Sequence, residues 1–562
     1  MDTTAGHIAA SRHVLDRAFN PRRIAVIGAS ANRAKWANML FRRLVDGPFQ
    51  GEVIPVNPGQ TQIEGQPCYP DIEAVPGEID YAQILIPRAE VPGAAAACAS
   101  KGVGVIHVLA AGFGEVDGQG LELQHALPDA LADSQTALIG PNSLGLYSAR
   151  AGLDFSRGCH FQPGPATFIS QSGALCTDIL ALGQARGLNF GKILSVGNCA
   201  GLDWPDYVRY CREDPETGIA AFYIESVTDG RALYGELRAL AAVKPVLVLK
   251  GGHSARGGRA VVSHTGRLAG EYRIWQAMLR QAGAIELDGI EDLLVALEAF
   301  DATSRPARDG GLMVIGSGGG ISVLISDGAE KRGLALADLN ASTLGALGNA
   351  IPDAAELGGV GNPVEIPIDR MLGEPERMAR LIAASAADPA VGAVLVHLNL
   401  IAVANHYADG VTVDWAQVCA RLAAAIETAP VPVQIWLRNA AAGEITTAFD
   451  QVAMARLGVE ARLPVFATLE EALGYFLRLR QRGRAHDRQD ALRRRGPGAC
   501  RRGGYSLRAL ECRRRCRCGM RGGGADRLAG RAEDRRRGCG SQKRRGLRGA
   551  GAERRSDPAR GL

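Results

Sequence analysis

The feature that most restricts the fold of this chain is a repeated alternation of short apolar runs with helix-like segments between residues 20 and 480. The apolar runs are rich in Val and Ile, and most of them end in small or turn-forming residues. The first, Arg23 to Ile27, leads through a Gly-containing turn into a helical pattern. Strands that alternate with helices at this spacing predict parallel sheets covered by helices on both faces. We therefore predict an α/β fold of doubly wound sheets.

A chain of 562 residues is too long for one hydrophobic core. Residues 301–310, rich in Pro, Arg and Asp, predict a linker. We predict doubly wound domains over residues 1–150, 160–303 and 310–481. The expected strands cover residues 23–27, 53–56, 84–86, 105–109 and 137–139, then 166–169, 193–196, 220–224 and 246–249, and finally 312–315, 394–398, 433–436 and 465–467. The clearest helical patterns cover residues 35–45, 174–185, 271–281, 292–300 and 470–479.

Residues 484–562 differ in kind from the rest of the chain. They contain 25 Lys and Arg against 8 Asp and Glu, and no Val, Ile, Phe, Trp, Thr or Asn. Because so few apolar side chains cannot form a core, we predict a disordered Arg/Gly-rich tail. A shifted reading frame in a GC-rich gene would yield this composition, and an Arg-rich nucleic-acid arm is the other interpretation. The lack of interleaved aromatic residues favours the frameshift, so we do not expect nucleic acid as a partner.

Charge, cysteine content and hydropathy narrow the class of protein. The tail carries a net charge of +17, and the whole chain carries +5. Residues 1–483 are therefore acidic, with a net charge of −12. Seven of the 12 cysteines lie outside the tail without metal-ligand spacing, which fits core residues in a reducing compartment and predicts no metal site. No apolar run reaches the roughly 18–20 residues that span a bilayer, and residues 1–20 lack a signal-peptide pattern. We expect a cytoplasmic protein that does not bind membranes.

The first strand-to-helix turn is a candidate phosphate site. Gly28 and Ser30 lie where the free N–H groups and dipole of a helix N-terminus favour an anion. The turn is not a G-x-G-x-x-G fingerprint, and Asn57-Pro58 stands where a ribose-binding carboxylate would follow the second strand. This disfavours NAD but not a nucleotide with a long pantetheine arm. An ordinary tight turn explains the pattern equally well.

Residues 170–173, Glu225 and the loop that carries His264 should meet at the carboxyl edge of the second predicted sheet, where open parallel sheets bind ligands. Ser170, Gln171, Ser172 and Gly173 precede the helix of residues 174–185 and can aim several donors at a phosphoryl group. Glu225 ends a neighbouring strand and could orient an imidazole. A helix N-cap and a solvated acid are the simpler interpretations of these two features.

His264 is the candidate nucleophile that such an edge would serve. It stands in the small-residue stretch Ser263-His-Thr-Gly266, which follows the strand of residues 246–249 and a glycine-rich loop. A neutral imidazole can carry a phosphoryl group covalently. A histidine in a loop is more often only a surface residue, so the residues by themselves leave both interpretations open.

In their order along the chain, these motifs resemble the NDP-forming acyl-CoA synthetases, which are similar to succinyl-CoA synthetases and include ADP-forming acetate–CoA ligases. The resemblance covers about residues 20–480. It rests on Ile27-Gly-Ala-Ser30, Pro55-Val-Asn-Pro58, Gly112-Phe-Gly-Glu115, Gly140-Pro-Asn-Ser-Leu-Gly145, Ser170-Gln-Ser-Gly-Ala-Leu175, Gly197-Asn198, Asp214-Pro-Glu-Thr217, Tyr223-Ile-Glu225, Lys244-Pro-Val-Leu-Val-Leu-Lys250, Ser263-His-Thr-Gly266, Ala269-Gly270, Ser317-Gly-Gly-Gly320, Asp327 and Gly361-Asn-Pro-Val364.

The resemblance implies a Rossmann-like CoA-binding domain followed by two flavodoxin-like ligase domains. The residues near the CoA nucleotide would be Gly28, Ala29, Ser30, Asn57 and Pro58. His264 would be the phosphohistidine, Glu225 its orienting acid, and Ser170 to Gly173 the helix terminus that binds phosphate. The family reaction converts a carboxylic acid, CoA and ATP into acyl-CoA, ADP and phosphate through an acyl phosphate and a phosphohistidine.

Two residues and one domain depart from the family pattern. Ser143 stands where Cys is usual and Gly201 where an acidic residue is common, which could reflect an acid other than acetate. The ATP-grasp domain, which binds ATP or ADP with Mg, is not recognisable in this sequence. The resemblance thus implies the CoA-ligase portion of an oligomeric acid–thiol ligase that needs an ATP-grasp subunit in trans. The alternative is a non-catalytic CoA- or acyl-CoA-binding regulatory module.

Overall fold

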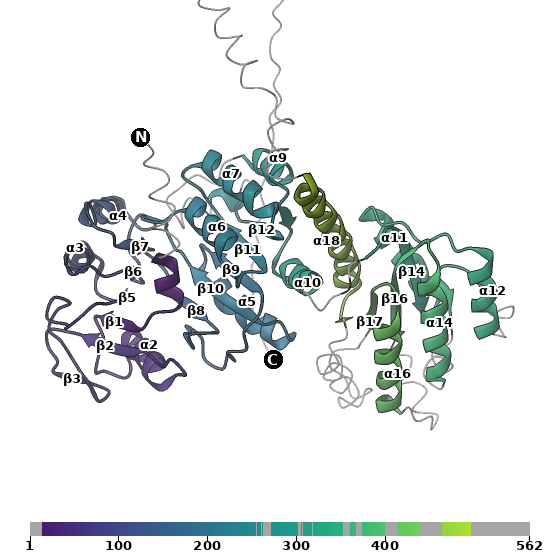
Figure 1. Cartoon of the computed structure of the whole chain (residues 1–562), viewed down its shortest axis with the longest axis horizontal. Helices are drawn as coiled ribbons and strands as arrows, with labels where there is room; N and C mark the ends of the chain where they lie inside the picture. Colours follow the sequence, from purple (N-terminus) through teal and green to yellow (C-terminus); the bar gives the residue numbers. More distant parts are fainter. Residues whose placement is uncertain are drawn as a thin grey trace, which may run out of the picture. The chain divides into compact units, whose positions relative to one another are not determined.

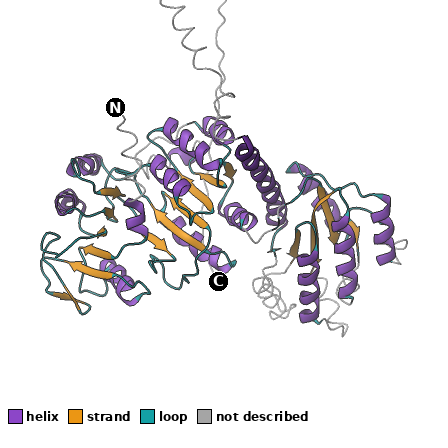
Figure 2. Ribbon diagram, viewed as in Figure 1, coloured by secondary structure: helices purple, strands orange, loops and turns teal. Residues whose placement is uncertain are grey.

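The computed structural model describes residues 14–254, 256–259, 261, 271–301, 305, 307–316, 318–351, 360–366, 374–399, 414–438 and 464–495. These residues form three main parallel sheets with helices around them (Figures 1 and 2). Within this part of the chain, no helix has both the length and the apolar character that crossing a membrane requires.

The first sheet has five parallel strands in the order β2-β1-β5-β6-β7. Its helices α2 and the pair α3 and α4 lie on opposite faces (Figure 1), as right-handed crossovers require for this strand order. A two-stranded hairpin, β3 with β4, is inserted after β2. The bounds are β1 Arg23–Ile27, α2 Trp36–Asp46, β2 Glu52–Val56, β3 Gln62–Ile63, β4 Gln66–Pro67, β5 Tyr81–Ile84, η1 Arg88–Glu90, α3 Val91–Lys101, β6 Val105–Val108, α4 Gly118–Ala130 and β7 Ala137–Ile139.

The second sheet has the order β13-β12-β11-β9-β10-β8, and only β8 is antiparallel to its neighbour. Helices α5 and α10 pack together, and α7 packs against both α6 and α9. The bounds are β8 Leu146–Ser148, β9 Ala166–Ser170, α5 Gly173–Ala185, β10 Phe190–Ser195, α6 Trp204–Glu213, β11 Ile219–Ile224, α7 Gly230–Ala241, β12 Val246–Lys250, α9 Tyr272–Ala282, β13 Ile285–Leu287 and α10 Ile290–Phe300.

The third sheet has five parallel strands in the order β15-β14-β16-β17-β18. Helix α11 packs against α18, and α14 packs against α12 and α16. The bounds are β14 Gly311–Gly316, α11 Gly319–Lys331, α12 Ala341–Ala350, β15 Val364–Glu365, α14 Pro375–Ala387, β16 Val391–Asn399, α16 Trp415–Thr428, β17 Val433–Arg438, β18 Val465–Phe466 and α18 Leu469–Arg495.

All three parallel sheets repeat one topology. With the hairpin and β8 set aside, each sheet places its second strand beside the first and its third strand on the other side of the first. This 2-1-3-4-5 order is that of flavodoxin, and the predicted doubly wound fold is confirmed. In each sheet one connection runs to one side of the first strand and the following connection to its other side. This switch in strand order, where doubly wound sheets have their ligand-binding crevice, lies at β1/β5, β9/β11 and β14/β16.

Some predicted boundaries differ from the structure. Residues 84–86 were expected as a strand, but β5 covers Tyr81–Ile84. Leu85 N still donates to Ile27 O, and Pro87, two residues later, has no N–H group with which to continue the ladder. Helix α18 continues past the predicted start of the tail at Arg484 and includes residues 484–495. Ala, Leu, Gln and Arg dominate this stretch, and all are strong helix formers. Residues 496–562 lie outside the described part.

The hydrophobic core does not divide cleanly at the predicted domain boundaries. Leu15, Ala18 and Phe19, from a helix over residues 14–19, share one apolar cluster with α6 and the second sheet. Phe19 stacks on Tyr210 with ring centroids 5.5 Å apart. At the other end, α18 packs against α10 and α11. The division into 1–150, 160–303 and 310–481 therefore stays a prediction.

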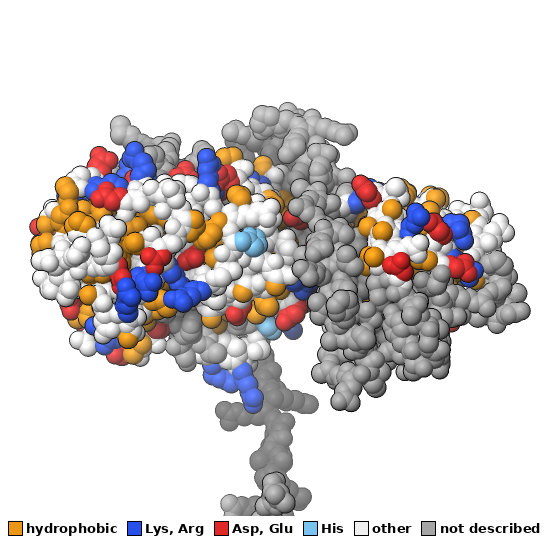
Figure 3. Space-filling model, turned by 90° about the horizontal axis from the view of Figure 1, so that it is seen from below, with side chains coloured by type: hydrophobic (Ala, Val, Ile, Leu, Met, Phe, Trp, Pro, Cys, Tyr) orange, Lys and Arg blue, Asp and Glu red, His pale blue; other side chains and the backbone are white. Residues whose placement is uncertain are grey.

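Charged side chains of both signs lie among apolar ones on the face shown in Figure 3. A buried ionic cluster, by contrast, lies on β10 of the second sheet. The Lys192 ammonium on β10 donates to Asp214 Oδ2 and Glu216 Oε2 at 2.7 Å each, and the Lys192 and Asp214 side chains are 3% and 4% exposed. Thr217 Oγ1 donates to the same Asp214 oxygen at 2.6 Å. The motif Asp214 to Thr217 thus forms a buried ionic anchor for β10.

This anchor makes a testable contribution to acid stability. Burial alone would raise the pKa of Asp214, but hydrogen bonds from Lys192 and Thr217 and the charge of Lys192 hold that pKa below its ordinary value. The unfolded chain then binds the extra proton first, so this contribution is present above the ordinary pKa of about 4 and is lost as the pH falls below it.

We expect Lys192→Met to lower the free energy of unfolding by about 3–5 kcal/mol at neutral pH, because Asp214 would remain buried without its cation. The loss of stability on acidification should also be smaller in this variant. Urea unfolding followed by circular dichroism between pH 3 and 7 measures both effects. Lys331→Met, at the exposed end of α11, is the control. Equal stability of the two variants would contradict the anchor.

Candidate functional site

The carboxyl edge of the second sheet brings several predicted residues together. Ser170 ends β9, Glu225 follows β11, and Lys250 ends β12. The parallel register pairs Tyr223 with Ser170 and Ile224 with Lys250, so these strand ends are adjacent. The crevice between β9 and β11 opens at this point.

The polar side chains of the predicted phosphate cradle contact the chain's own backbone. Ser172 caps α5 by accepting from Leu175 N at 3.4 Å. Ser170 Oγ accepts from Ser172 N at 3.0 Å and donates to Ser172 O at 2.8 Å. Gly173 and Ala174 are the first two residues of α5, where backbone N–H groups have no acceptor within the helix. These backbone groups, rather than the serine hydroxyls, are the donors that can receive an anion.

Gln171 connects this helix start to Glu225. Its side-chain Oε1 accepts from the backbone N–H groups of Glu225 at 2.7 Å and Ser226 at 3.0 Å. The Glu225 residue is 5% exposed. Burial and the neighbouring Glu225 carboxylate raise the pKa of Tyr223. Because its backbone N–H donates to Gln171 and the residue is buried, Glu225 does not project freely into solvent.

His264 lies outside the described residues, as does the rest of the stretch 262–270. The structure does describe where the chain enters and leaves this segment. It enters at Gly251, directly after β12, and leaves at Tyr272, where α9 begins. The entry point therefore lies at the carboxyl edge of the second sheet, beside the end of β11.

A buried polar chain joins the first sheet to the second. Tyr81 Oη lies 2.6 Å from His107 Nδ1, and His107 Nε2 lies 2.5 Å from Ser143 Oγ. Ser143 Oγ in turn donates to Ser195 O at 2.7 Å, at the end of β10. His107 is fully buried on β6. Sequence reasoning missed His107, although its place in an otherwise apolar strand was the available signal.

The hydrogen-bond directions fix the state of this histidine. Ser143 has one hydroxyl proton, which goes to the carbonyl of Ser195, so its oxygen must accept from His107 Nε2–H. Nδ1 must then accept from the Tyr81 hydroxyl. Burial lowers the pKa of His107 to about 3, which keeps the ring neutral. The loop of residues 140–145 is thereby fixed beside α5. A Cβ on Gly173 would lie only 2.9 Å from Leu144 Cβ, so the loop and the start of the helix are in close contact.

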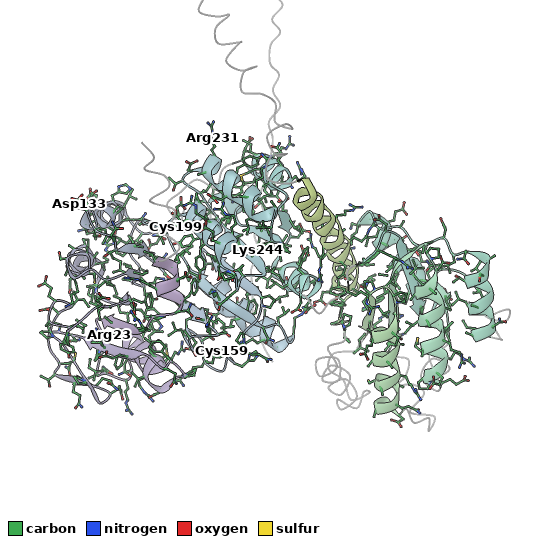
Figure 4. The ribbon with its side chains drawn as sticks, in the orientation of Figure 1. Arg23, Asp133, Cys159, Cys199, Arg231 and Lys244 are labelled. Carbon is green, nitrogen blue, oxygen red and sulfur yellow. The ribbon has the colours of Figure 1, made fainter. Side chains whose placement is uncertain are left out.

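A second set of contacts joins the same two sheets. Glu115 accepts from Gly112 N at 2.6 Å and Phe113 N at 3.0 Å through one oxygen, and from Asn198 Nδ2 at 2.6 Å through the other. Asn142 and Cys199, both with positive φ, lie on the two facing loops. Strained backbone of this kind is concentrated at functional sites. Figure 4 labels Cys199 on the loop after β10.

The predicted CoA residues lie at the carboxyl edge of the first sheet, beside the β1/β5 crevice. Gly28 has φ +90°, and a Cβ there would lie 2.7 Å from Ile86 Cγ2, so the turn requires glycine. Asn57 Nδ2 donates to Ala29 O at 2.8 Å, and Ser30 Oγ accepts from Asn32 N at 3.1 Å. Pro58 follows Asn57 in the turn after β2. The turns after β1 and β2 thus form one fixed unit at the carboxyl edge of the first sheet.

The family described as "CoA binding domain" matches residues 22–149, and the "Succinyl-CoA ligase like flavodoxin domain" matches residues 163–300. The chain is 36% identical, over 355 residues, to the alpha subunit of the ADP-forming acetate–CoA ligase II of Pyrococcus furiosus. That match covers 63% of this chain and 76% of the relative. The chain belongs to the family of ADP-forming acetate–CoA ligases.

Other family members differ in length. The ADP-forming acetate–CoA ligase I of Archaeoglobus fulgidus is 34% identical over 390 residues, a match that covers 68% of this chain but only 55% of that relative. A solved acetyl-coenzyme A synthetase of Candidatus Korarchaeum cryptofilum, in complex with phosphate and ADP, has a TM-score of 0.71 and 27% identity. It covers 85% of this chain, and 98% of its own chain is matched. The predicted family and the predicted succession of a CoA-binding and a flavodoxin-like ligase fold are confirmed.

We expect His107 of this family member to stay the neutral Nε2–H tautomer from pH 8 to pH 5, because its pKa lies near 3. The unfolded chain takes up this proton near pH 6.5, so stability should fall as the pH drops from about 6.5 towards 3. Histidine ring 15N shifts, assigned with His107→Gln, measure the tautomer directly. A titration of His107 with a midpoint near 6.5 would contradict the buried chain.

Proposed function

We propose that this chain is the CoA-ligase portion of an NDP-forming acyl-CoA synthetase, with His264 as the carrier of a phosphoryl group. The observation that carries the proposal is the convergence of the α5 N-terminus, Glu225 and the end of β12 at one crevice edge. The segment that contains His264 starts directly from that edge. Membership of the acetate–CoA ligase family supports the same activity.

The proposed reaction needs two transfers. In the direction from acyl-CoA, a phosphate oxygen attacks the thioester carbonyl, the carbon–sulfur bond breaks, and CoA leaves as the thiolate. The unprotonated nitrogen of His264 then attacks phosphorus, the bond between phosphorus and the acyl oxygen breaks, and the carboxylate leaves. The imidazole keeps its other proton, so phosphohistidine forms with a positive ring.

The residues of the crevice edge have separate roles in this proposal. The first-turn N–H groups of α5 would bind the phosphoryl oxygens. Glu225 would accept from the second nitrogen of His264 and offset the positive charge of the phosphorylated ring. Gly28, Ala29, Ser30, Asn57 and Pro58 would hold the CoA nucleotide at the first sheet. The substrates are thus a carboxylic acid or acyl-CoA, CoA and phosphate.

The full reaction would require a second protein component. The Pyrococcus furiosus relative is named as a subunit alpha, and the chain spans about half the length of the Archaeoglobus fulgidus relative. We propose that an ATP-grasp subunit binds ATP or ADP with Mg and exchanges the phosphoryl group with His264, within an oligomeric, cytoplasmic enzyme. The half-reaction with acyl-CoA and phosphate needs no nucleotide.

The half-reaction can be tested on the chain alone. Incubation with acetyl-CoA and 32P-phosphate should place an acid-labile, base-stable label on the wild type and none on His264→Ala. Glu225→Gln should slow labelling about 10- to 100-fold, the usual effect of removing the partner of a functional histidine. His253→Ala is the matched control, because His253 lies in the same segment between β12 and α9 and its ring centre lies 5.2 Å from that of Tyr272.

Three other outcomes of the labelling would contradict the proposal. Label that survives in His264→Ala would place the phosphoryl group on another residue. Loss of label in His253→Ala as well would show that the loss in His264→Ala is not specific to that histidine. A wild type that binds CoA by calorimetry but takes up no label with acetyl-, propionyl- or butyryl-CoA would favour the non-catalytic acyl-CoA-binding module.

A further inference from the structure

A buried cation stands at the crevice edge, and the proposed reaction assigns it no role. Lys250 is 4% exposed at the end of β12. Burial lowers the pKa of its ammonium to about 8, and the nearby Glu225 opposes this shift only in part. Keeping a charged group in such a place is unfavourable unless its donors are satisfied. The contacts of this one ammonium therefore indicate what it is for.

Each contact of Lys250 leads to a different element of the edge. Its Nζ donates to the backbone carbonyl of Glu225 at 2.8 Å and to that of Gly251. The same nitrogen lies 5.0 Å from the ring centre of Trp275, on the first turns of α9. Lys250 thus connects the acid to Gly251, where the chain enters the segment 251–271, and to the helix into which that segment leads.

The entry point itself has no spare room. A Cβ on Gly251 would lie 2.5 Å from Tyr223 Oη and 3.2 Å from Glu225 Cγ. A contact below 3.0 Å would force a neighbouring atom to shift, so Gly251 packs directly against Tyr223, on β11, and Glu225, which follows β11. The position of Gly251 is therefore fixed to the acid by packing on one side and by Lys250 on the other.

We propose that Lys250 is a positioning residue for phosphoryl transfer, which holds both ends of the His264 segment in register with Glu225. This inference rests on the proposed function of His264. Lys250 is assigned no contact with the phosphoryl group, because two of its three N–H groups donate to backbone carbonyls and, among the described residues, the Trp275 ring lies beside the same nitrogen. A misplacement of about 1 Å can slow a transfer about 100-fold.

The strand offers a matched control at its other end. Lys244, labelled in Figure 4, precedes β12, and its Nζ also donates to two backbone carbonyls, those of Cys211 at 2.7 Å and of Asp214. Lys244→Met and Lys250→Met therefore remove the same chemical group and the same kind of contacts from opposite edges of one sheet. Only the second change is made at the edge that carries Glu225.

The test measures 32P labelling of the full chain with acetyl-CoA and phosphate, at saturation and at limiting acetyl-CoA. We expect Lys250→Met to lower the saturated rate about 10- to 100-fold, with the half-saturating acetyl-CoA concentration changed less than about twofold. Lys244→Met should label within about threefold of the wild type. Thermal midpoints of both variants give the structural cost of each substitution, and Lys250→Arg, which keeps the cation, should label faster than Lys250→Met.

The outcomes separate this inference from the function on which it rests. A wild type without label at His264 contradicts the proposed function. A labelled wild type with equal saturated rates for Lys250→Met and Lys244→Met contradicts the role of Lys250 alone. A loss in Lys250→Met that appears only as a higher half-saturating concentration would make Lys250 part of substrate binding, and would also overturn the positioning role.

Discussion

The pairing of β9 with β11 is the constraint on which the candidate site depends. The chain leaves β9 towards β10 on one side and reaches β11 on the other, so no crossover covers the ends of these two strands. Gln171 fills the gap by accepting from the N–H groups of Glu225 and Ser226. The start of α5 and the acid are thus joined through one side-chain amide, and neither can shift without the other.

The seam between the first and second sheets adds a second constraint. Tyr81, His107, Ser143 and Ser195 form a chain in which each donor has one acceptor. Fully satisfied buried networks of this kind fix a single arrangement, because any rotation leaves a polar atom unpaired. The contact of Glu115 with Asn198 acts in the same place. The loops that follow β6, β7 and β10 are therefore held together as one surface beside the N-terminus of α5.

The fold could be predicted from the sequence because periodic apolar runs report burial directly. The strand Arg23 to Ile27 and the start of α5 at Gly173 were placed within one residue of their observed bounds. The short strands β8, β13 and β15 were missed, because two or three residues at a sheet edge carry no periodic signal. Their pairing is set by distant neighbours, as in the antiparallel contact of β8 with β10. The apolar strand around His107 signals a buried polar residue, but its partner could not be predicted, since a hydrogen bond between residues 36 positions apart leaves no local pattern.

The two departures from the family pattern, Ser143 and Gly201, can be explained by this seam without any change of acid substrate. A Cβ on Gly201 would lie 2.6 Å from the backbone oxygen of Leu138, so an acidic side chain has no room beside β7. Ser143 must donate to Ser195 O and accept from both His107 and Gly145 N. A hydroxyl does this well, whereas a thiol is a weak donor and a weak acceptor. Both residues therefore have structural partners that account for them, and neither departure by itself indicates a different acid substrate.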